Sequence, residues 1–502
     1  MPPDTVSSES LAPGLDRWLR FTVRRPLFIV ACALLLTVLA AISATRLHKD
    51  TSANAYIEPD NPALLYREKV IETFGLKEPI VIAVVGSSPA GILSVDSLRL
   101  VRDLVERVER IPNVDPDRIV SVVSQSSIRG GADTLEVSPL LPAGEIDALT
   151  VTTLREALDS TTLYDGTLVA RDRSATVIVA ELLDERQSAA TYQAVLDLTR
   201  SIAKPGGIEL HVAGAGAITG YFSTYIDRDA GRLVPFTAIA VSMVLFCAFF
   251  STRSSALPML IAAMTVIATL GAMAASGVAF YAITNGMVVV LIGISVAEPM
   301  HVFGEYYALL RNRPTLSNAE LVRGALRNVW WPIALTSVTT LVGFLSLWLT
   351  STMPPIRYFG LFGAFGVLVA WVLTVSLLPA AMALLPKGAP KESPSPERAP
   401  DAVSRFMFAV GGRVIRAPRT VLAVTAILSV AALSAAALVR VDHARIENFN
   451  ADEPIYIADR EINRVLAGTN QLDIVIESSS DDGILMPEAL RRIDALQTYV
   501  TS

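Results

Sequence analysis

Six stretches of this chain contain no Asp, Glu, Lys or Arg and are long enough to cross a lipid bilayer. They cover residues 26–45, 233–252, 254–297, 328–356, 358–386 and 420–439. A membrane-spanning helix needs about 20 consecutive apolar residues, so the 44-residue stretch 254–297 accounts for two spans. Ser276, Gly277 and the turn dipeptide Asn285-Gly286 divide it. The sequence therefore predicts a polytopic membrane protein with seven helices.

Composition excludes several other classes of protein. Charged residues make up 18% of the chain, whereas soluble proteins average about 25%. The 48 acidic and 42 basic residues give a net charge of −6, which offers no case for nucleic-acid binding. Cys32 and Cys247 both lie in apolar stretches, so neither a disulfide framework nor a cysteine-rich metal site is expected.

Basic residues near the ends of the spans predict the orientation, because they concentrate on the cytoplasmic side. Segment 46–232, with 27 acidic and 19 basic residues, then lies outside, and the N-terminus lies in the cytoplasm. The basic residues that fall on one side are Arg17, Arg20, Arg24, Arg25, Arg253, Arg311, Arg313, Arg323, Arg327, Lys387, Lys391, Arg398, Arg405, Arg413, Arg416 and Arg419.

The chain repeats itself at an offset of 392 to 394 residues. The matching pairs are Arg25-Pro26 with Ala417-Pro418, Asn61-Pro62 with Glu453-Pro454, Arg67-Glu68 with Arg460-Glu461, Gly75 with Gly468, Ile80-Val81-Ile82 with Ile474-Val475-Ile476, and Gly91-Ile92-Leu93 with Gly483-Ile484-Leu485. One helix followed by an exterior domain therefore occurs twice. The second copy stops at Ser502, inside a predicted helix, so we expect the chain to be the first part, about 60%, of a longer duplicated protein. A natural half-domain is the alternative.

The exterior segment 46–232 is predicted to be an α/β domain. Residues 79–86, 118–123, 174–183 and 208–213 are β-branched runs of strand length, and 95–110 and 189–203 have helical periodicity. Strands that alternate with helices in this way favour split βαβ units. The predicted organisation is a cytoplasmic N-terminus (1–25), a first span (26–45), the exterior domain (46–232), spans two to six (233–386), a cytoplasmic linker (387–417), a seventh span (418–439) and the start of a second exterior domain (440–502).

One carboxylate interrupts the apolar spans. Glu298 ends the run of 44 uncharged residues, and His301 follows three positions later on the same predicted helical face. A charge inside the bilayer costs about 2.5–3.5 kcal/mol on insertion scales, so such a residue usually faces a cavity and has a function. Apolar surroundings favour the neutral form of a carboxylic acid, and imidazole titrates near neutral pH. The pair is therefore predicted to be a proton relay.

The helix that carries Glu298 leaves alternatives open. In one interpretation the span runs through Val302, which places Glu298 inside it. In the other the helix ends near Ala297, which leaves Glu298 among lipid head groups. Pro299 either kinks the helix, as in many transporters, or marks its end.

His301 and Glu305 are four residues apart, but two ligands are a weak metal signal and no HExxH motif is present. No metal, cofactor or catalytic residue is predicted, and His48, His211 and His443 are expected on the surface or in loops.

Hydroxyl residues in the fifth span are candidates for supporting Glu298. Thr336, Ser337, Thr339 and Thr340 lie on adjoining faces, and Gly343 would allow close helix contact. Hydrogen bonds back to their own helix are the alternative. Gly360, Gly363 and Gly366 in the sixth span are expected to serve helix packing.

These features resemble the resistance-nodulation-division (RND) superfamily, and within it the branch of MMPL and Patched-like exporters. Three stretches carry the resemblance: 293–301 (GISVAEPMH), 335–347 (LTSVTTLVGFLSL), and 356–362 (IRYFGLF) with Leu378-Pro379-Ala380. The resemblance implies an RND-type architecture with ferredoxin-like exterior porter domains and export driven by the proton gradient. The fourth-helix carboxylate of the family carries the proton, and that role falls on Glu298, with His301 beside it. Here glutamate replaces the usual aspartate, and Pro299 replaces a small residue.

Three functions are compared. The first is a proton-driven exporter of hydrophobic or lipid-like molecules in a bacterial inner or plasma membrane, with membrane lipids and a homo-oligomer or periplasmic accessory protein as partners. The second is a sterol-sensing-type lipid receptor or scaffold, which needs no titrating carboxylate. The third, an intramembrane hydrolase using Glu298 and His301, lacks a nucleophile and a metal set. The exporter is preferred, and the protein is not expected to be an enzyme. The identity of the substrate cannot be inferred from the sequence.

Overall fold

The computed structural model describes residues 13–52, 54–75, 77–87, 91–130, 135–249, 251–387, 402–439, 445–466, 468–469, 474–478, 480 and 482–501. The chain divides into two compact units. A helical unit comprises Met1–Glu58 and Ser223–Arg445, and an α/β unit comprises Pro59–Phe222 and Ile446–Ser502.

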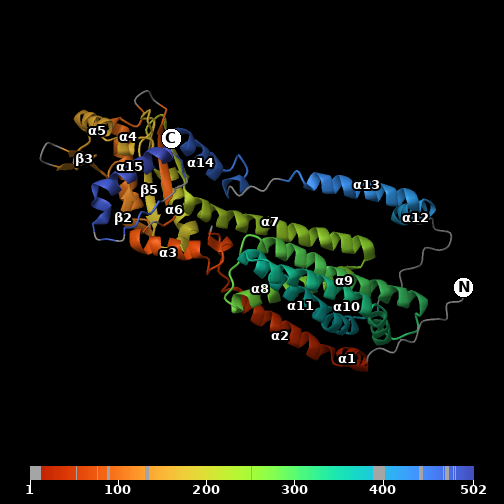
Figure 1. Cartoon of the computed structure of the whole chain (residues 1–502). Coiled ribbons are helices and arrows are strands. Elements are labelled where there is room, and N and C mark those ends of the chain that lie inside the picture. The colour runs from red at the N-terminus through yellow and green to blue at the C-terminus, as the bar shows by residue number, and fades with distance from the viewer. Residues whose placement is uncertain are drawn as a thin grey trace. The chain divides into compact units, whose positions relative to one another are not determined.

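Seven of the described helices are long and apolar enough to cross a membrane. They are α2 (Pro26–Ala44), α7 (Ala215–Phe249), α8 (Thr252–Ala275), α9 (Thr284–Asn312), α10 (Asn318–Thr350), α11 (Pro354–Leu384) and α13 (Pro418–Ala436). The division of the 44-residue apolar stretch is confirmed, because α8 ends at Ala275, Gly277 adopts a left-handed φ of 69°, and α9 begins at Thr284. Within the helical unit, α2 and α8–α11 pack side by side (Figure 1).

Two of the apolar clusters in the interior of these packed helices contain residues of α8, α9, α10 and α11. The first includes Ile261, Met264, Val302, Phe303, Ile333, Val375 and Leu378. The second includes Met273, Met287, Leu291, Phe362 and Val367, with Leu341 and Phe344 packed against it. Each cluster draws residues from α8, α9, α10 and α11, so these four helices are joined at two levels along their length.

Glycines on α11 allow it to approach α10 closely. A Cβ at Gly360 would lie 2.6 Å from Phe344 O and 2.7 Å from Trp348 N, and one at Gly363 would lie 2.6 Å from the Phe344 ring. The expectation that these glycines serve packing is confirmed. The same expectation for Gly343 is wrong, since a Cβ there would meet nothing within 4 Å.

The α/β unit is built on a four-stranded antiparallel sheet in the order β2-β5-β1-β6. Its strands are β1 (Ile80–Gly86), β2 (Val114–Val120), β5 (Ala175–Leu182) and β6 (Ile208–Ala213). Helix α4 (Val95–Val108) connects β1 to β2, and α6 (Ser188–Ser201) connects β5 to β6. Each connection passes over one intervening strand, so the sheet contains two interleaved split βαβ units, as the sequence predicts.

The remaining elements of this unit surround the sheet. They are α3 (Pro62–Phe74), the hairpin β3 (Ser126–Gly130) and β4 (Leu135–Pro139), α5 (Ala148–Ser160), η2 (Thr162–Tyr164), η3 (Glu185–Gln187), η4 (Arg445–Asn448), α14 (Pro454–Val465), η5 (Gly483–Leu485) and α15 (Pro487–Thr501). The predicted apolar face of α4, from Leu98 to Val108, is buried. The sequence did not predict the β3–β4 hairpin, and β2 begins four residues earlier than expected, with an irregular register between Val114 and Ile119.

The sequence repeat is also a repeat of structure. Helices α13, α14 and α15 each begin 392 residues after α2, α3 and α4. Residues 474–478, which match the start of β1, form no strand; β1 is a central strand with partners on both sides, and 474–478 have no such partners among the described residues. The predicted linker 387–417 contains a helix, α12 (Ala402–Arg416), which begins where the prolines end. Residues 388–401 and His443 lie outside the described residues.

Candidate functional site

Glu298 lies well inside α9. The helix continues past Pro299 and ends only at Asn312, although the proline removes one backbone donor. The alternative in which the fourth helix ends near Ala297 is therefore wrong. Pro299 is an internal residue of the helix and directly follows the carboxylate.

The Glu298 side chain is buried and is held by a hydroxyl from the neighbouring helix. Only 5% of the residue is exposed. Ser337 Oγ on α10 forms a short hydrogen bond with Glu298 Oε1 and also lies 2.7 Å from the carbonyl of Ile333 in its own helix. Ser337 is itself 7% exposed, so this contact is shielded from the surroundings. Of the four hydroxyls proposed as support, Ser337 is the one that reaches the carboxyl group.

The second carboxylate oxygen has no such partner. Glu298 Oε2 is fully buried, and no described residue forms a hydrogen bond with it. The Thr374 hydroxyl on α11 faces the same carboxyl group, but without normal hydrogen-bond geometry, and its Oγ1 is likewise buried and unpartnered among the described residues. No cationic side chain in the described part of the chain compensates the charge of Glu298. One oxygen of the carboxyl group, Oε1, is thus hydrogen-bonded, and the other, Oε2, has no hydrogen-bond partner among the described residues.

Glu298 belongs to a polar layer between the two apolar clusters. We define this layer as Thr265, Ser295, Glu298, Ser337 and Thr374, all of which are buried. On each helix the polar residues lie between a residue of the first cluster and one of the second: Met264–Thr265–Met273 on α8, Leu291–Ser295–Glu298–Val302 on α9, Ile333–Ser337–Leu341 on α10, and Val367–Thr374–Val375 on α11. Thr265 Oγ1 and Ser295 Oγ also lack a partner among the described residues.

The other hydroxyls of α10 follow the alternative in which they bond their own helix. Thr336 donates to the carbonyls of Pro332 and Ile333, and Thr339 and Thr340 both donate to the carbonyl of Thr336. The hydroxyl groups of these three threonines therefore donate to carbonyls within α10. None of the three has a hydrogen bond to Glu298 among the described residues.

His301 occupies a different environment from Glu298. Its side chain is exposed, whereas Glu298, one turn away, is buried. Gly293, Ala297 and Gly304, at helical spacing from His301, are exposed too. Glu305 accepts a hydrogen bond of 2.7 Å from Asn328 Nδ2. The described residues contain no group of three or more His, Cys, Asp or Glu side chains that could hold a metal ion.

Sequence reasoning missed Thr265, Ser295 and Thr374. Each is a single hydroxyl within an apolar stretch, and such residues commonly bond their own helix. A usable signal was present in one case, because Ser295 lies three residues before Glu298 and so shares its helical face. Thr265 and Thr374 are on helices far away in sequence, so only the packing of α8 and α11 against α9 reveals them.

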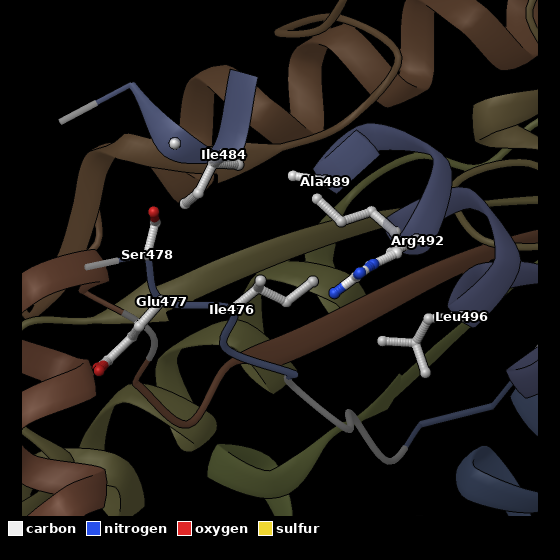
Figure 2. Close-up of a pocket in the computed structure, with 9 residues that line it drawn as sticks. Ile476, Glu477, Ser478, Ile484, Ala489, Arg492 and Leu496 are labelled. Carbon is white, nitrogen blue, oxygen red and sulfur yellow. The ribbon is translucent and has the colours of Figure 1, made fainter. Parts of the chain in front are cut away.

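A pocket of about 390 Å³ lies in the α/β unit. It is lined by residues 476–478 and 483–484 and by α15, and Figure 2 shows Arg492 extending from α15 toward Ile476. Arg492 is already paired with Glu488 at 2.7 Å, and the other lining residues are mostly apolar. Glu477, the carboxylate that lines the pocket, is exposed and lies 3.6 Å from Lys69, so the polar layer is the stronger candidate site.

The three known proteins described next resemble this chain in sequence over 46% to 74% of its length. A protein of Methanocaldococcus jannaschii that is described as a membrane protein is 23% identical over 381 residues, covering 74% of this chain and 93% of that protein. The sulfolipid-1 exporter MmpL8 of Mycobacterium tuberculosis is 23% identical over 331 residues, covering 64% of this chain and 30% of the exporter. A membrane protein of Streptomyces coelicolor is 28% identical over 244 residues, covering 46% of this chain and 33% of its own length.

The family comparison agrees with these similarities. The model of the MMPL family matches residues 81–434, a range that runs from β1 through α13 and includes the whole polar layer. The resemblance inferred from the motifs of the fourth, fifth and sixth helices is thereby confirmed. Together, this match and the seven apolar helices show that the chain is a multi-pass membrane protein that belongs to the MMPL family.

Proposed function

We propose that this protein is an exporter of hydrophobic or lipid-like molecules, driven by the proton-motive force, and that Glu298 carries the proton. The observation that supports this most strongly is the buried carboxyl group with one oxygen bonded to Ser337 and the other open, in a layer without a compensating cation. An uncompensated ion is costly in such surroundings. A carboxyl group placed there is suited to binding and releasing a proton rather than to holding a fixed ion pair.

Ser337 supports both protonation states. A hydroxyl has one proton to donate and can accept from others, and Ser337 has two acceptors within reach, Ile333 O and Glu298 Oε1. When Glu298 is ionised, the hydroxyl donates to the carboxylate. When Glu298 is protonated, the carboxylic acid donates to Ser337, and the hydroxyl donates to Ile333 O. The same pair of side chains thus remains bonded in each state, with the direction of donation reversed.

The other hydroxyls of the polar layer are the proposed route for the proton. Buried polar groups without a protein partner are commonly satisfied by internal water, and Thr265, Ser295 and Thr374 each contribute such a group. His301, exposed and one turn from Glu298, is the proposed second station of the relay. Thr336, Thr339 and Thr340 bond carbonyls of their own helix, so we assign them no direct part in the relay.

The remaining architecture fits an exporter. The sheet order β2-β5-β1-β6 with two split βαβ units is that of a ferredoxin-like domain, and we propose that this unit is the exterior porter domain. Basic residues at the span ends favour a cytoplasmic N-terminus. A lipid-like substrate is supported by the relative named as a sulfolipid-1 exporter. The chain covers 30% of that exporter's length, so its substrate and activity are proposals for this protein.

Transport by the protein in proteoliposomes tests this function. We expect an imposed pH gradient to drive accumulation of fluorescent lipid analogues, a protonophore to abolish it, and Glu298→Gln to reduce it to the background of empty vesicles while expression and thermal stability are retained. An amide has the size of the carboxyl group but cannot exchange a proton with the layer.

The same variant separates the exporter from a receptor or scaffold. A sterol-sensing-type protein needs no titrating carboxylate, so its lipid binding should survive Glu298→Gln unchanged. Transport that persists in this variant at the wild-type rate, or that ignores the protonophore, would contradict proton coupling at Glu298.

A further inference from the structure

Two amphipathic helices precede two of the apolar spans. Helix α1 (Pro13–Arg24) ends directly before α2, and α12 (Ala402–Arg416) ends directly before α13. Their arginines contribute to the predicted orientation of the chain, and the proposed transport function gives these helices no further role. Each is joined by a single residue to a helix that is long and apolar enough to span a membrane. An amphipathic helix in this position is expected to lie at the surface of the bilayer.

The two junctions have the same backbone geometry. Arg25 has φ −123° and ψ 52°, and Ala417 has φ −132° and ψ 56°. In each case a proline follows as the first residue of the span, which disfavours helical geometry at the residue before it. The junction residue still bonds the carbonyl four positions earlier, at 2.9 Å from Arg25 N to Phe21 O and 3.0 Å from Ala417 N to Arg413 O. The bend is therefore a defined feature that the duplication has preserved.

Helix α1 presents three distinct faces. Leu19 and Thr22 are buried where α1 packs on α10 and α11. Beside this contact, Trp18 and Phe21 are each 40% exposed. Their ring centroids are 5.9 Å apart, and Phe21 lies 6.2 Å from the exposed ring of Phe28 on α2. Aromatic side chains that continue across the bend onto a span are typical of the interface between acyl chains and head groups.

The third face of α1 is basic. Arg17, Arg20 and Arg24 are spaced three and four residues apart and so share a face. Asp16 pairs with Arg20 and, at 3.3 Å, with Arg323, and these guanidinium groups hold the pKa of Asp16 below its usual value. No ion pair within the described residues involves Arg24 or Arg25, and both are exposed.

Helix α12 repeats this pattern. Arg405, Arg413 and Arg416 share one face by helical spacing, and no ion pair within the described residues involves Arg413, Arg416 or Arg419. Phe406 and Phe408 are 61% and 78% exposed, and Met407, Val410, Val414 and Ile415 are exposed as well. An apolar face next to a basic face, with exposed arginines that form no ion pair within the described residues (Arg24 and Arg25 at α1, Arg413 and Arg416 at α12), therefore precedes both spans.

We propose that α1 and α12 form a repeated binding surface for the head groups of anionic phospholipids in the leaflet where α2 and α13 begin. The aromatic side chains enter the upper acyl region, and Arg24, Arg25, Arg413, Arg416 and Arg419 bind the phosphates, since guanidinium groups match phosphate oxygens in pairs. Assignment of this leaflet to the cytoplasmic side rests on the orientation proposed above. Binding of the lipids themselves does not depend on transport.

Trp18 provides a local probe for the test. The full chain is reconstituted into nanodiscs that contain phosphatidylcholine and phosphatidylglycerol, with one or the other brominated at equal mole fraction, and the Trp18 signal is obtained by subtracting that of Trp18→Phe. We expect brominated phosphatidylglycerol to quench Trp18 more strongly. The preference should fall about fivefold for each arginine lost in Arg24→Gln/Arg25→Gln, because a juxtamembrane arginine attracts anionic lipid by about this factor.

Matched variants keep the test specific. Arg46→Gln, at the other end of α2, should leave the preference unchanged, and Arg24→Lys/Arg25→Lys should keep most of it. Phe408→Trp in the Trp18→Phe background reports on α12, where Arg413→Gln/Arg416→Gln should have the same effect. Equal quenching by the two lipids, or a preference that persists without the arginines, would overturn the proposal. Transport is not measured, so this result is independent of proton coupling.

Discussion

Two glutamates of this protein each lack a hydrogen bond at one buried carboxylate oxygen, but they differ in whether a cation lies beside the carboxylate. Glu298 in the helical unit and Glu181 on β5 of the α/β unit each have a buried Oε2 without a hydrogen-bond partner among the described residues. Glu181 has the Arg118 guanidinium 3.6 Å from that oxygen, whereas no described cation compensates Glu298. The charge of Glu181 is thus partly compensated by Arg118. No described cation lies beside Glu298, and this difference supports the proposal that Glu298, rather than Glu181, carries the transported proton.

The largest expected effect comes from removing the charge of each glutamate in turn. Glu298→Gln should abolish pH-driven lipid transport in proteoliposomes. Glu181→Gln should leave it near the wild-type rate, because Glu181 belongs to the α/β unit and not to the helices that carry the polar layer. Equal losses in both variants, at equal expression, would show that the two carboxylates do not differ in function.

Removing the hydroxyl that holds Glu298 should have a smaller effect. A hydrogen bond to a charged group contributes about 1.5–3 kcal/mol, so Ser337→Ala should lower the transport rate about tenfold or more, with a shifted pH dependence. Thr336→Ala, next to it, is the matched control, since Thr336 bonds only its own helix. A pH profile that is unchanged in Ser337→Ala would contradict the role given to this hydroxyl.

The packing that supports the polar layer can be tested at two glycines. Gly360→Ala should destabilise the protein by about 1–3 kcal/mol, because its Cβ would overlap Phe344 O and Trp348 N. Gly343→Ala should be neutral or should stabilise α10 by up to about 1 kcal/mol, since its Cβ meets nothing within 4 Å. Thermal unfolding in detergent measures both. The reverse order would mean that α10 and α11 pack through Gly343.

The smallest expected effect is a change in how the stability of the α/β unit depends on pH when Glu181 is replaced. Burial raises the pKa of Glu181 above its ordinary value of 4.5, and Arg118 partly opposes this. A carboxyl group with a raised pKa in the folded state favours folding when protonated, so its contribution is present below pH 4.5 and is lost as the pH rises through the raised value. Glu181→Gln should flatten this part of the stability profile of the α/β unit, as measured by pH-dependent proteolysis of the intact protein. A steeper profile would contradict the direction of the shift.

The sequence was most informative where a pattern is long or a residue is out of place. Uncharged stretches located the apolar helices, β-branched runs located the four strands of the sheet, and a charge within a span identified Glu298. It was least informative about the rotation of each helix around its axis. That rotation decides that Ser337 faces Glu298 while Thr336, Thr339 and Thr340 do not, that His301 is exposed, and that Gly360 rather than Gly343 touches the neighbouring helix. It depends on contacts among α8–α11, which no local spacing encodes.

Helices α10 and α11 approach each other so closely at Gly360 and Gly363 that neither helix can slide without displacing the other's backbone or the Phe344 ring. Ser337 and Thr374, the two hydroxyls that face Glu298, belong to these two helices. The distance between these two hydroxyls is therefore fixed by the contact between α10 and α11. If the carboxyl group changes its hydrogen-bond partner from one hydroxyl to the other, the side chain of Glu298, or α9 itself, has to move.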